Sequence, residues 1–168
     1  MRGYLLDTNV VCYWFDERSE KHVDVTTHID QLSDAMLFVS AVSLGEIAFG
    51  HRCESKSPTT IQLGLSSFVR SQLPHVVDVK RATAQYFGEI KARIFGKFSK
   101  QRGRKKQRLR QLTDPLSGEE LGVDENDLWI AACAVEHNLV LVTYDKMARL
   151  REVTNDVLDF EDWAAATD

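Results

Sequence analysis

The stretch of sequence that decides the fold runs from Asn126 to Asp145 and reads NDLWIAACAVEHNLVLVTYD. Up to His137 it has apolar residues around most of its circumference, which predicts a helix buried on most sides. Asn138 suits the left-handed position that ends many helices. The apolar run 139–143 then predicts a strand covered on both faces. A buried helix followed directly by such a strand is typical of an α/β fold with a parallel sheet.

The remainder of the chain repeats this alternation of short apolar runs and helical patterns. Strands are predicted at residues 4–6, 37–39 and 76–79, with a last short strand near Val153 or at 157–158. Helices are predicted at residues 10–15, 42–49, 59–73, 81–98 and 126–137, with a further short helix beginning at Asp145. Residues 101–124 lose this periodicity and contain glycine and proline, so we expect a loop or insertion there. This order predicts one α/β domain over residues 1–168, with a central, mostly parallel sheet flanked by helices.

The bulk composition is that of an ordinary globular protein. A chain of 168 residues suits one compact domain, and 43% hydrophobic with 27% charged residues is usual for such a domain. No apolar run approaches the length of a bilayer span, and the first residues are too polar for a secretory signal. The three cysteines, Cys12, Cys53 and Cys133, include no Cys-x-x-Cys pair. This argues against a disulfide framework or a zinc ribbon and predicts a cytoplasmic protein.

Four acidic residues, Asp7, Glu46, Asp127 and Asp145, stand at the ends of predicted elements. Each has an ordinary structural explanation. Asp7 and Asp145 could cap the segments that follow them. Glu46 could form a capping box with Ser43, and Asp127 lies in a first helical turn, where a negative charge suits the helix dipole.

Their joint placement favours a catalytic interpretation. Asp7, Asp145 and Glu46 fall just past the carboxyl ends of predicted strands, where ligands bind in open α/β sheets. Acids that converge there repel one another unless a cation neutralises them. Oxygen ligands without His or Cys select hard ions, so Mg²⁺ or Mn²⁺ is the expected cofactor. Such an ion can polarise a phosphodiester and activate water.

Four short motifs carry a resemblance to a known family. Residues 5–9 read LLDTN, 40–46 SAVSLGE, 126–132 NDLWIAA and 141–145 LVTYD. They resemble, in order, the four motifs of PIN domains, most closely those of the VapC-type toxins of prokaryotic toxin–antitoxin pairs. The resemblance covers about residues 3–52 and 124–160.

The resemblance implies a PIN-like three-layer fold and a Mg²⁺- or Mn²⁺-dependent endoribonuclease. Such toxins are often homodimers and are silenced by a cognate antitoxin that inserts into the active-site groove. By position, the catalytic and metal-binding acids would be Asp7, Glu46, Asp127 and Asp145, and the polar supports would be Asn9 and Thr143.

A basic segment separates the second and third motifs. Residues 91–110 hold ten of the 21 Lys and Arg residues and no acid, although the chain as a whole has a net charge of −4. This makes the separation of Glu46 from Asp127 long for a small toxin of the resembled family. We expect a basic insertion or arm at about 97–122, with RNA phosphate contacts from Lys97, Lys100, Arg102, Arg104, Lys105, Lys106 and Arg108.

Two other uses of the basic arm remain open. It could be a solvated surface, or it could neutralise an acidic antitoxin. The alternative to a nuclease is a catalytically weak RNA-binding or regulatory module whose affinity resides in this arm. The intact set of carboxylates favours the enzyme.

Overall fold

Five parallel strands form the centre of the molecule. The computed structural model describes residues 2–54, 60–99, 112 and 120–165. Within these residues the strand order is β3-β2-β1-β4-β5, and every pair of neighbours is parallel. The strands are β1 (Gly3–Leu6), β2 (Met36–Ser40), β3 (His75–Val77), β4 (Val140–Val142) and β5 (Phe160–Glu161). The predicted parallel sheet is confirmed.

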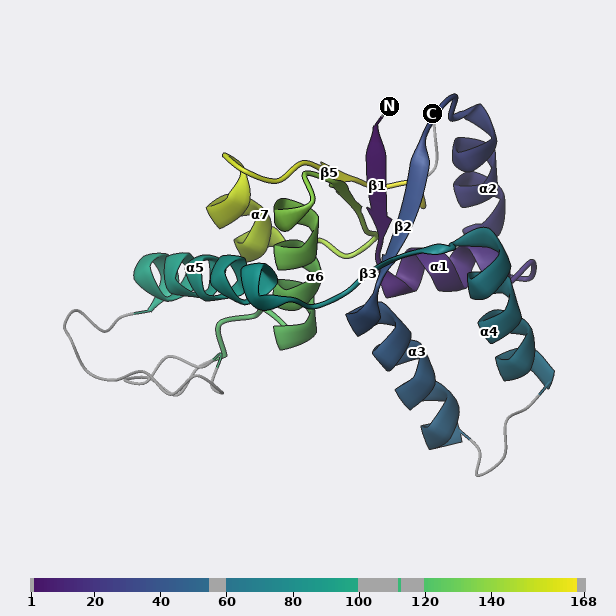
Figure 1. Ribbon diagram of the computed structural model, residues 1–168, viewed down its shortest axis with the longest axis horizontal. Helices are drawn as coiled ribbons and strands as arrows, with labels where there is room; N and C mark the ends of the chain where they lie inside the picture. Colours follow the sequence, from purple (N-terminus) through teal and green to yellow (C-terminus); the bar gives the residue numbers. More distant parts are fainter. Residues whose placement is uncertain (1, 55–59, 100–111, 113–119, 166–168) are drawn as a thin grey trace.

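Helices cover both faces of this sheet, as Figure 1 shows, so the predicted three-layer arrangement is also confirmed. One side carries α5, α6 and α7, and the other carries α1, α2 and α4, while α3 extends away from the end of β2. The helices are α1 (Thr8–Phe15), α2 (His22–Gln31), α3 (Ala41–Glu54), α4 (Thr60–Gln72), α5 (Arg81–Phe98), α6 (Glu125–Glu136) and α7 (Ala148–Thr154). No helix in the described ranges is long and apolar enough to cross a membrane.

Side chains of the two central strands alternate between two hydrophobic cores. Leu5 and Leu141 are fully buried in the core that α5, α6 and α7 complete. Tyr4, Leu6 and Val142 belong to the core on the opposite face, which α1, α3 and α4 complete. Successive residues of a strand point to opposite faces, so a strand between two helical layers must be apolar at every position. This is why the strands are continuous apolar runs in the sequence.

Most predicted elements are confirmed. The strand predicted at 76–79 lies at His75–Val77, and the larger differences fall in residues 22–31 and after Asp145. The short helix predicted to begin at Asp145 begins at Ala148, and Val153 lies inside that helix. The last strand is not at 153 or 157–158 but is the two-residue β5, which pairs with β4. Such a short strand has no periodicity to detect, and only its partner defines it. The helix α2 was missed because Val25 is its one buried residue.

Asn138 has the left-handed backbone that was predicted, with φ 52°. Only part of the predicted basic arm lies in the described ranges. Its first residues end α5, whereas 100–111 and 113–119 lie outside the described residues.

The helix α3 presents two different faces to two hollows of the surface. A groove of about 560 Å³, here called the α3–α4 groove, lies between it and α4 and β3; α3 contributes Leu44, Ile47, Ala48, His51 and Arg52. A second hollow of about 510 Å³, here called the α3–α6 hollow, is lined by Val42, Gly45, Glu46, Phe49 and Asn126. Residues three and four apart share a helix face, which explains the division. One helix therefore borders both the acid-bearing side and an apolar groove.

Gly50, inside α3, gives a direct test of the helix. A Cβ built at Gly50 meets no heavy atom within 4 Å. We expect Gly50→Ala to raise the free energy of unfolding by about 1 kcal/mol, because glycine is about that much less favourable than alanine in a helix interior. Urea unfolding measures the change. Gly64→Ala on α4 is the matched control, because there the Cβ would lie 3.2 Å from the Phe15 ring and the gain should be smaller or absent. Equal gains at both positions would contradict the described packing.

Candidate active site

The four predicted acids gather at the carboxyl edge of the sheet. Asp7 follows β1 directly, Asp145 follows β4, and Glu46 lies on α3, which begins where β2 ends. Because β2, β1 and β4 are neighbours, their carboxyl ends meet at one edge. Asp127, in the first turn of α6, lies close enough for Asp7, Asp145 and Glu46 to raise its pKa. The structure thus brings all four together.

Asp7 is the buried centre of this group, with 3% of its surface exposed. Its Oδ1 accepts a hydrogen bond from the backbone N of Thr8 at 2.7 Å, so it does cap α1, as the structural explanation predicts. Its Oδ2 accepts one from the hydroxyl of Thr143 at 2.7 Å. Thr143 lies 136 residues further along the chain. A cap requires only the first bond, and the second joins the ends of β1 and β4.

Asn9 connects the two acids of this edge. Its Nδ2 donates to Asp7 Oδ2 at 3.1 Å and to Asp145 Oδ2 at 3.0 Å. Its Oδ1 accepts from the backbone N of Tyr144 at 3.4 Å. Thr143 also accepts a hydrogen bond from the backbone N of Asp145 at 3.1 Å. Asn9 and Thr143 therefore both hold Asp7 and Asp145 in position.

Glu46 is held by two residues that the sequence did not single out. Its Oε2 accepts a hydrogen bond from the hydroxyl of Thr8, and its Oε1 accepts one from the Asn126 amide at 2.8 Å. The capping-box explanation of Glu46 is wrong, because α3 begins at Ala41 and the hydroxyl of Ser40 accepts from the backbone N of Ser43. Thr8 follows Asp7 and Asn126 precedes Asp127 in the sequence, and this adjacency could have identified both residues as part of the site.

The electrostatics of the group are those of uncompensated negative charge. Burial raises the pKa of Asp127 to about 7, and the charges of Asp7, Asp124, Asp145 and Glu46 add to the effect. Burial also raises the pKa of Asp7, although hydrogen bonds from Thr143 and Thr8 oppose this. In the described part of the chain, the hydrogen-bond partners found for Asp7, Glu46 and Asp145 are neutral. The negative charge therefore remains available to a cation.

This donor set fits a hard divalent cation in chemistry and in charge. All the donors are oxygens, which Mg²⁺ and Mn²⁺ prefer. As the side chains stand, no three His, Cys, Asp or Glu side chains of the described residues are arranged to hold one ion. Carboxylate oxygens of Asp7, Glu46 and Asp145 instead accept hydrogen bonds from Thr8, Asn9, Asn126 and Thr143. A cation would replace some of these hydrogen bonds.

The predicted RNA-binding residues of the basic arm are mostly outside the described ranges. Lys97 is described, and its Nζ pairs with Glu152 at 2.7 Å. Lys100, Arg102, Arg104, Lys105, Lys106 and Arg108 lie outside the described residues. A phosphate contact from Lys97 would compete with this ion pair, and RNA binding by the arm stays a prediction.

Comparison with known families matches the PIN domain model to residues 4–154, a range that contains all four acids. The chain belongs to the PIN domain family. PIN domains are typically nucleases and are generally metal-dependent. No curated protein matches the chain in sequence.

Solved structures share this fold at low sequence identity. VapBC2 from Rickettsia felis, bound to a promoter DNA fragment, is similar with a TM-score of 0.67 and 22% identity, over 96% of this chain and 98% of that one. DNA-bound VapBC from Salmonella typhimurium has a TM-score of 0.64 and 18% identity, over 97% and 99%. VapBC-5 from Mycobacterium tuberculosis, a member of the VapBC family of toxin–antitoxin systems, has 0.54 and 18%, over 96% and 98%. At these identities the likeness establishes a shared fold.

The raised pKa of Asp127 predicts how metal-free PIN domain stability depends on pH. The folded pKa of about 7 lies above the ordinary value of 3.8, so between these values the folded protein holds a proton that the unfolded chain has lost. The free energy of unfolding should therefore fall as pH rises through this window. Asp127→Asn should flatten the fall and make the protein more stable at neutral pH. Urea unfolding in chelator at about pH 5 and about pH 7.5 measures both.

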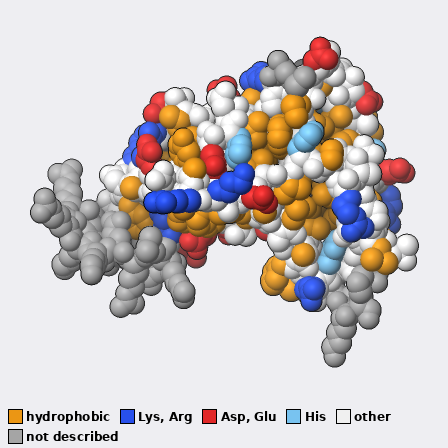
Figure 2. Space-filling model, viewed as in Figure 1, with side chains coloured by type: hydrophobic (Ala, Val, Ile, Leu, Met, Phe, Trp, Pro, Cys, Tyr) orange, Lys and Arg blue, Asp and Glu red, His pale blue; other side chains and the backbone are white. Residues whose placement is uncertain are grey.

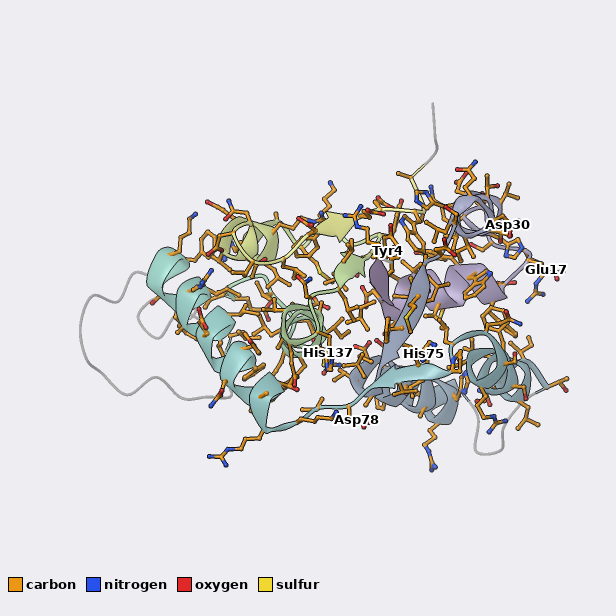
Figure 3. The ribbon with its side chains drawn as sticks, turned by 45° about the horizontal axis from the view of Figure 1, so that its top comes forward. Tyr4, Glu17, Asp30, His75, Asp78 and His137 are labelled. Carbon is orange, nitrogen blue, oxygen red and sulfur yellow. The ribbon has the colours of Figure 1, made fainter. Side chains whose placement is uncertain are left out.

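Asp30→Asn is the charge-matched control for this experiment. Asp30 is exposed on α2 and is labelled in Figure 3, at the outer part of that helix. Its replacement removes the same negative charge and should leave the pH dependence unchanged. Because the pKa of Asp7 is also raised, some slope should remain in Asp127→Asn. A slope as steep as that of the wild type would show that the folded pKa of Asp127 is not raised.

Proposed function

We propose that this PIN domain is a metal-dependent endoribonuclease and the toxin of a type II toxin–antitoxin pair. The observation that carries the enzymatic part is the cluster of four acids from β1, α3, α6 and the end of β4, in which Asp127 has a pKa of about 7. Charges of one sign are concentrated in this way at functional sites, where a ligand compensates the cost. Membership of the PIN family supports RNA phosphodiester hydrolysis as the chemistry.

A Mg²⁺ or Mn²⁺ ion held by Asp7, Glu46, Asp127 and Asp145 would polarise the phosphodiester and activate the attacking water. The products are expected to carry 5′-phosphate and 3′-hydroxyl ends. The chain's own residues would hold the four acids in position and allow them to be deprotonated when the ion binds.

The hydrogen-bond network assigns different tasks to the acids. The Asp7 carboxylate accepts hydrogen bonds from the Thr8 backbone and the Thr143 hydroxyl, which fix its position. Asn9 donates to both Asp7 and Asp145 and so holds Asp145 beside Asp7. Asp127 is about half protonated at neutral pH in the metal-free protein, because its pKa is about 7. Metal ligands must be deprotonated, so ion binding would release this proton.

Removal of one buried carboxylate tests the nuclease. We expect Asp7→Asn to lower RNA cleavage by orders of magnitude while the protein stays folded, because the substitution removes a hard-ion ligand and also relieves repulsion among the acids.

Mg²⁺ or Mn²⁺ should raise the melting temperature of the wild type and should raise it far less in Glu46→Gln or Asp127→Asn, since a ligand that binds the native state stabilises that state. Gel assays with a chelator control and thermal melts measure these effects, with Asp30→Asn as the matched variant.

Two outcomes would separate the alternatives. Full metal-dependent cleavage by Asp7→Asn would remove Asp7 from the site. RNA binding without metal-dependent cleavage in the wild type would favour the weak binding module that uses the basic arm.

The toxin role requires a partner. We infer that an antitoxin segment binds in the α3–α4 groove, which none of the four acids lines, in addition to the active-site groove that the family resemblance implies. The groove is lined mainly by apolar side chains, among them the 57% exposed Leu63. The exposed Arg52 and Arg70 also line it. Figure 2 shows hydrophobic side chains interspersed with Lys, Arg and His on the face that carries β3, α3 and α4. An amphipathic segment with acidic residues would complement this surface.

Solved toxin–antitoxin complexes of the same fold support such a partner. The homodimer stays a prediction.

A charge placed in the groove tests this partner surface. We expect Leu63→Glu to abolish binding of the protein encoded by the adjacent open reading frame, because a carboxylate would be buried in an apolar interface. RNA cleavage by the isolated protein should be unchanged. Val157→Glu, at a 44% exposed position after α7, is the control. Titration calorimetry measures both, and equal affinities for the two variants would rule out the groove as the binding surface.

A further inference from the structure

Phe49 is an exposed aromatic residue beside the acids. Its side chain is 70% exposed, and it belongs to neither of the two hydrophobic cores in the described residues. It follows Glu46 by three positions on α3, which places the two on the same helix face at about 5–6 Å between Cβ atoms. Exposure of a large apolar ring to water is unfavourable in free energy. Its location next to a catalytic carboxylate therefore points to a ligand.

The other aromatic side chain among the large exposed hydrophobic residues, Tyr144, differs from Phe49 in having partners. Its ring packs edge-on against Tyr13 with centroids 5.8 Å apart. The Lys21 ammonium lies 5.2 Å from its centroid. Tyr144 is 41% exposed and is held in place from two sides. Of these two exposed rings of the described residues, Phe49 is therefore the one with a face available to a ligand.

The α3–α6 hollow supplies the space for that ligand. Phe49 and Gly45 lie on its α3 side, and Asn126 closes it from α6. Glu46 is both a wall of the hollow and an acid of the site, and Asn126 donates to it at 2.8 Å. A Cβ at Gly45 would meet nothing within 4 Å, so the absence of a side chain there keeps the hollow open. The hollow thus extends from Glu46, one of the four acids, to the Phe49 ring.

We propose that Phe49 is the platform on which a nucleobase next to the scissile phosphate stacks, within the α3–α6 hollow. The proposal rests on the proposed nuclease function, since the phosphate must lie at the four acids. A base is joined to its phosphate through one sugar, a reach comparable with the separation of Glu46 and Phe49. Every base has a flat π-face, so an aromatic platform adds affinity with little sequence preference. Phe49 would thereby orient the strand for cleavage.

The test measures RNA binding by a variant that is expected not to cleave RNA. Asp127→Asn protein would be titrated into a short single-stranded RNA carrying 2-aminopurine, whose fluorescence is quenched when it stacks. Phe49→Trp should bind at least as tightly as the parent, whereas Phe49→Leu and Phe49→Ala should bind about tenfold more weakly, or roughly 1.4 kcal/mol, and lose the quenching. Phe49→Leu keeps apolar bulk without a ring and so isolates stacking. Ile61→Ala, at a 58% exposed position on α4, is the control.

A second pair of variants tests the hollow with Phe49 intact. Gly45→Leu should fill the hollow and weaken binding to a similar extent, whereas Gly50→Leu on the same helix should not. A Cβ at either position meets no heavy atom within 4 Å, and thermal melts check that both variants fold.

The outcomes distinguish this proposal from the nuclease itself. If the wild type cuts RNA while Phe49→Leu and Phe49→Ala bind as tightly as the parent, the base platform is excluded and the nuclease stands. A change of sedimentation in Phe49→Ala with unchanged RNA binding would instead assign Phe49 to an interface between copies. If the wild type neither binds nor cuts RNA in Mg²⁺ or Mn²⁺, both proposals fall together.

Discussion

The hydrogen bond from the Thr143 hydroxyl to the buried Asp7 carboxylate, 2.7 Å long, joins the ends of β1 and β4. The two strands are parallel neighbours, and Asp7 N also donates to the Val142 carbonyl at 2.9 Å. A carboxylate that is 3% exposed is costly to bury without partners. The donors on Thr8 and Thr143 offset part of that cost, and the other acids are arranged around Asp7. The position of the whole site depends on this pair of strand ends.

Neutral side chains hold the acids together without cancelling their charge. A lysine or arginine at the position of Asn9 or Asn126 would stabilise the fold through ion pairs, but it would leave less negative charge for a metal. Amides and hydroxyls instead fix the geometry and leave the repulsion in place. Burial is the main reason why the pKa of Asp127 is about 7, and the charges of the neighbouring acids add to it. In the proposed nuclease, a divalent cation provides the compensation that the chain itself withholds. In that proposal, the metal-free protein has a lower folding stability because the site needs negative charge to bind the cation.

The helix α3 connects the site to two surfaces with different proposed uses. Its Glu46 and Phe49 face borders the acids and the α3–α6 hollow, whereas its Leu44 and Ile47 face borders the α3–α4 groove. With apolar residues on both faces, α3 lacks the single stripe of an ordinary surface helix. A partner seated in the groove would contact the same helix that carries Glu46 of the acidic cluster. This gives a physical route by which the proposed antitoxin could influence the proposed RNA binding.

The sequence by itself determined the parallel α/β architecture and the four acids, because buried strands leave continuous apolar runs and strand ends carry the polar residues that follow them. It could not place the two-residue β5, which is too short to show a pattern, or α2, which is mostly polar and has Val25 as its one buried residue. Only the tertiary structure showed that Glu46 contacts Thr8 and Asn126, which lie 38 and 80 residues away, rather than its own helix cap. Local spacing favours a cap, and long-range packing overrides it because the ends of β1, β2 and β4 meet at one edge.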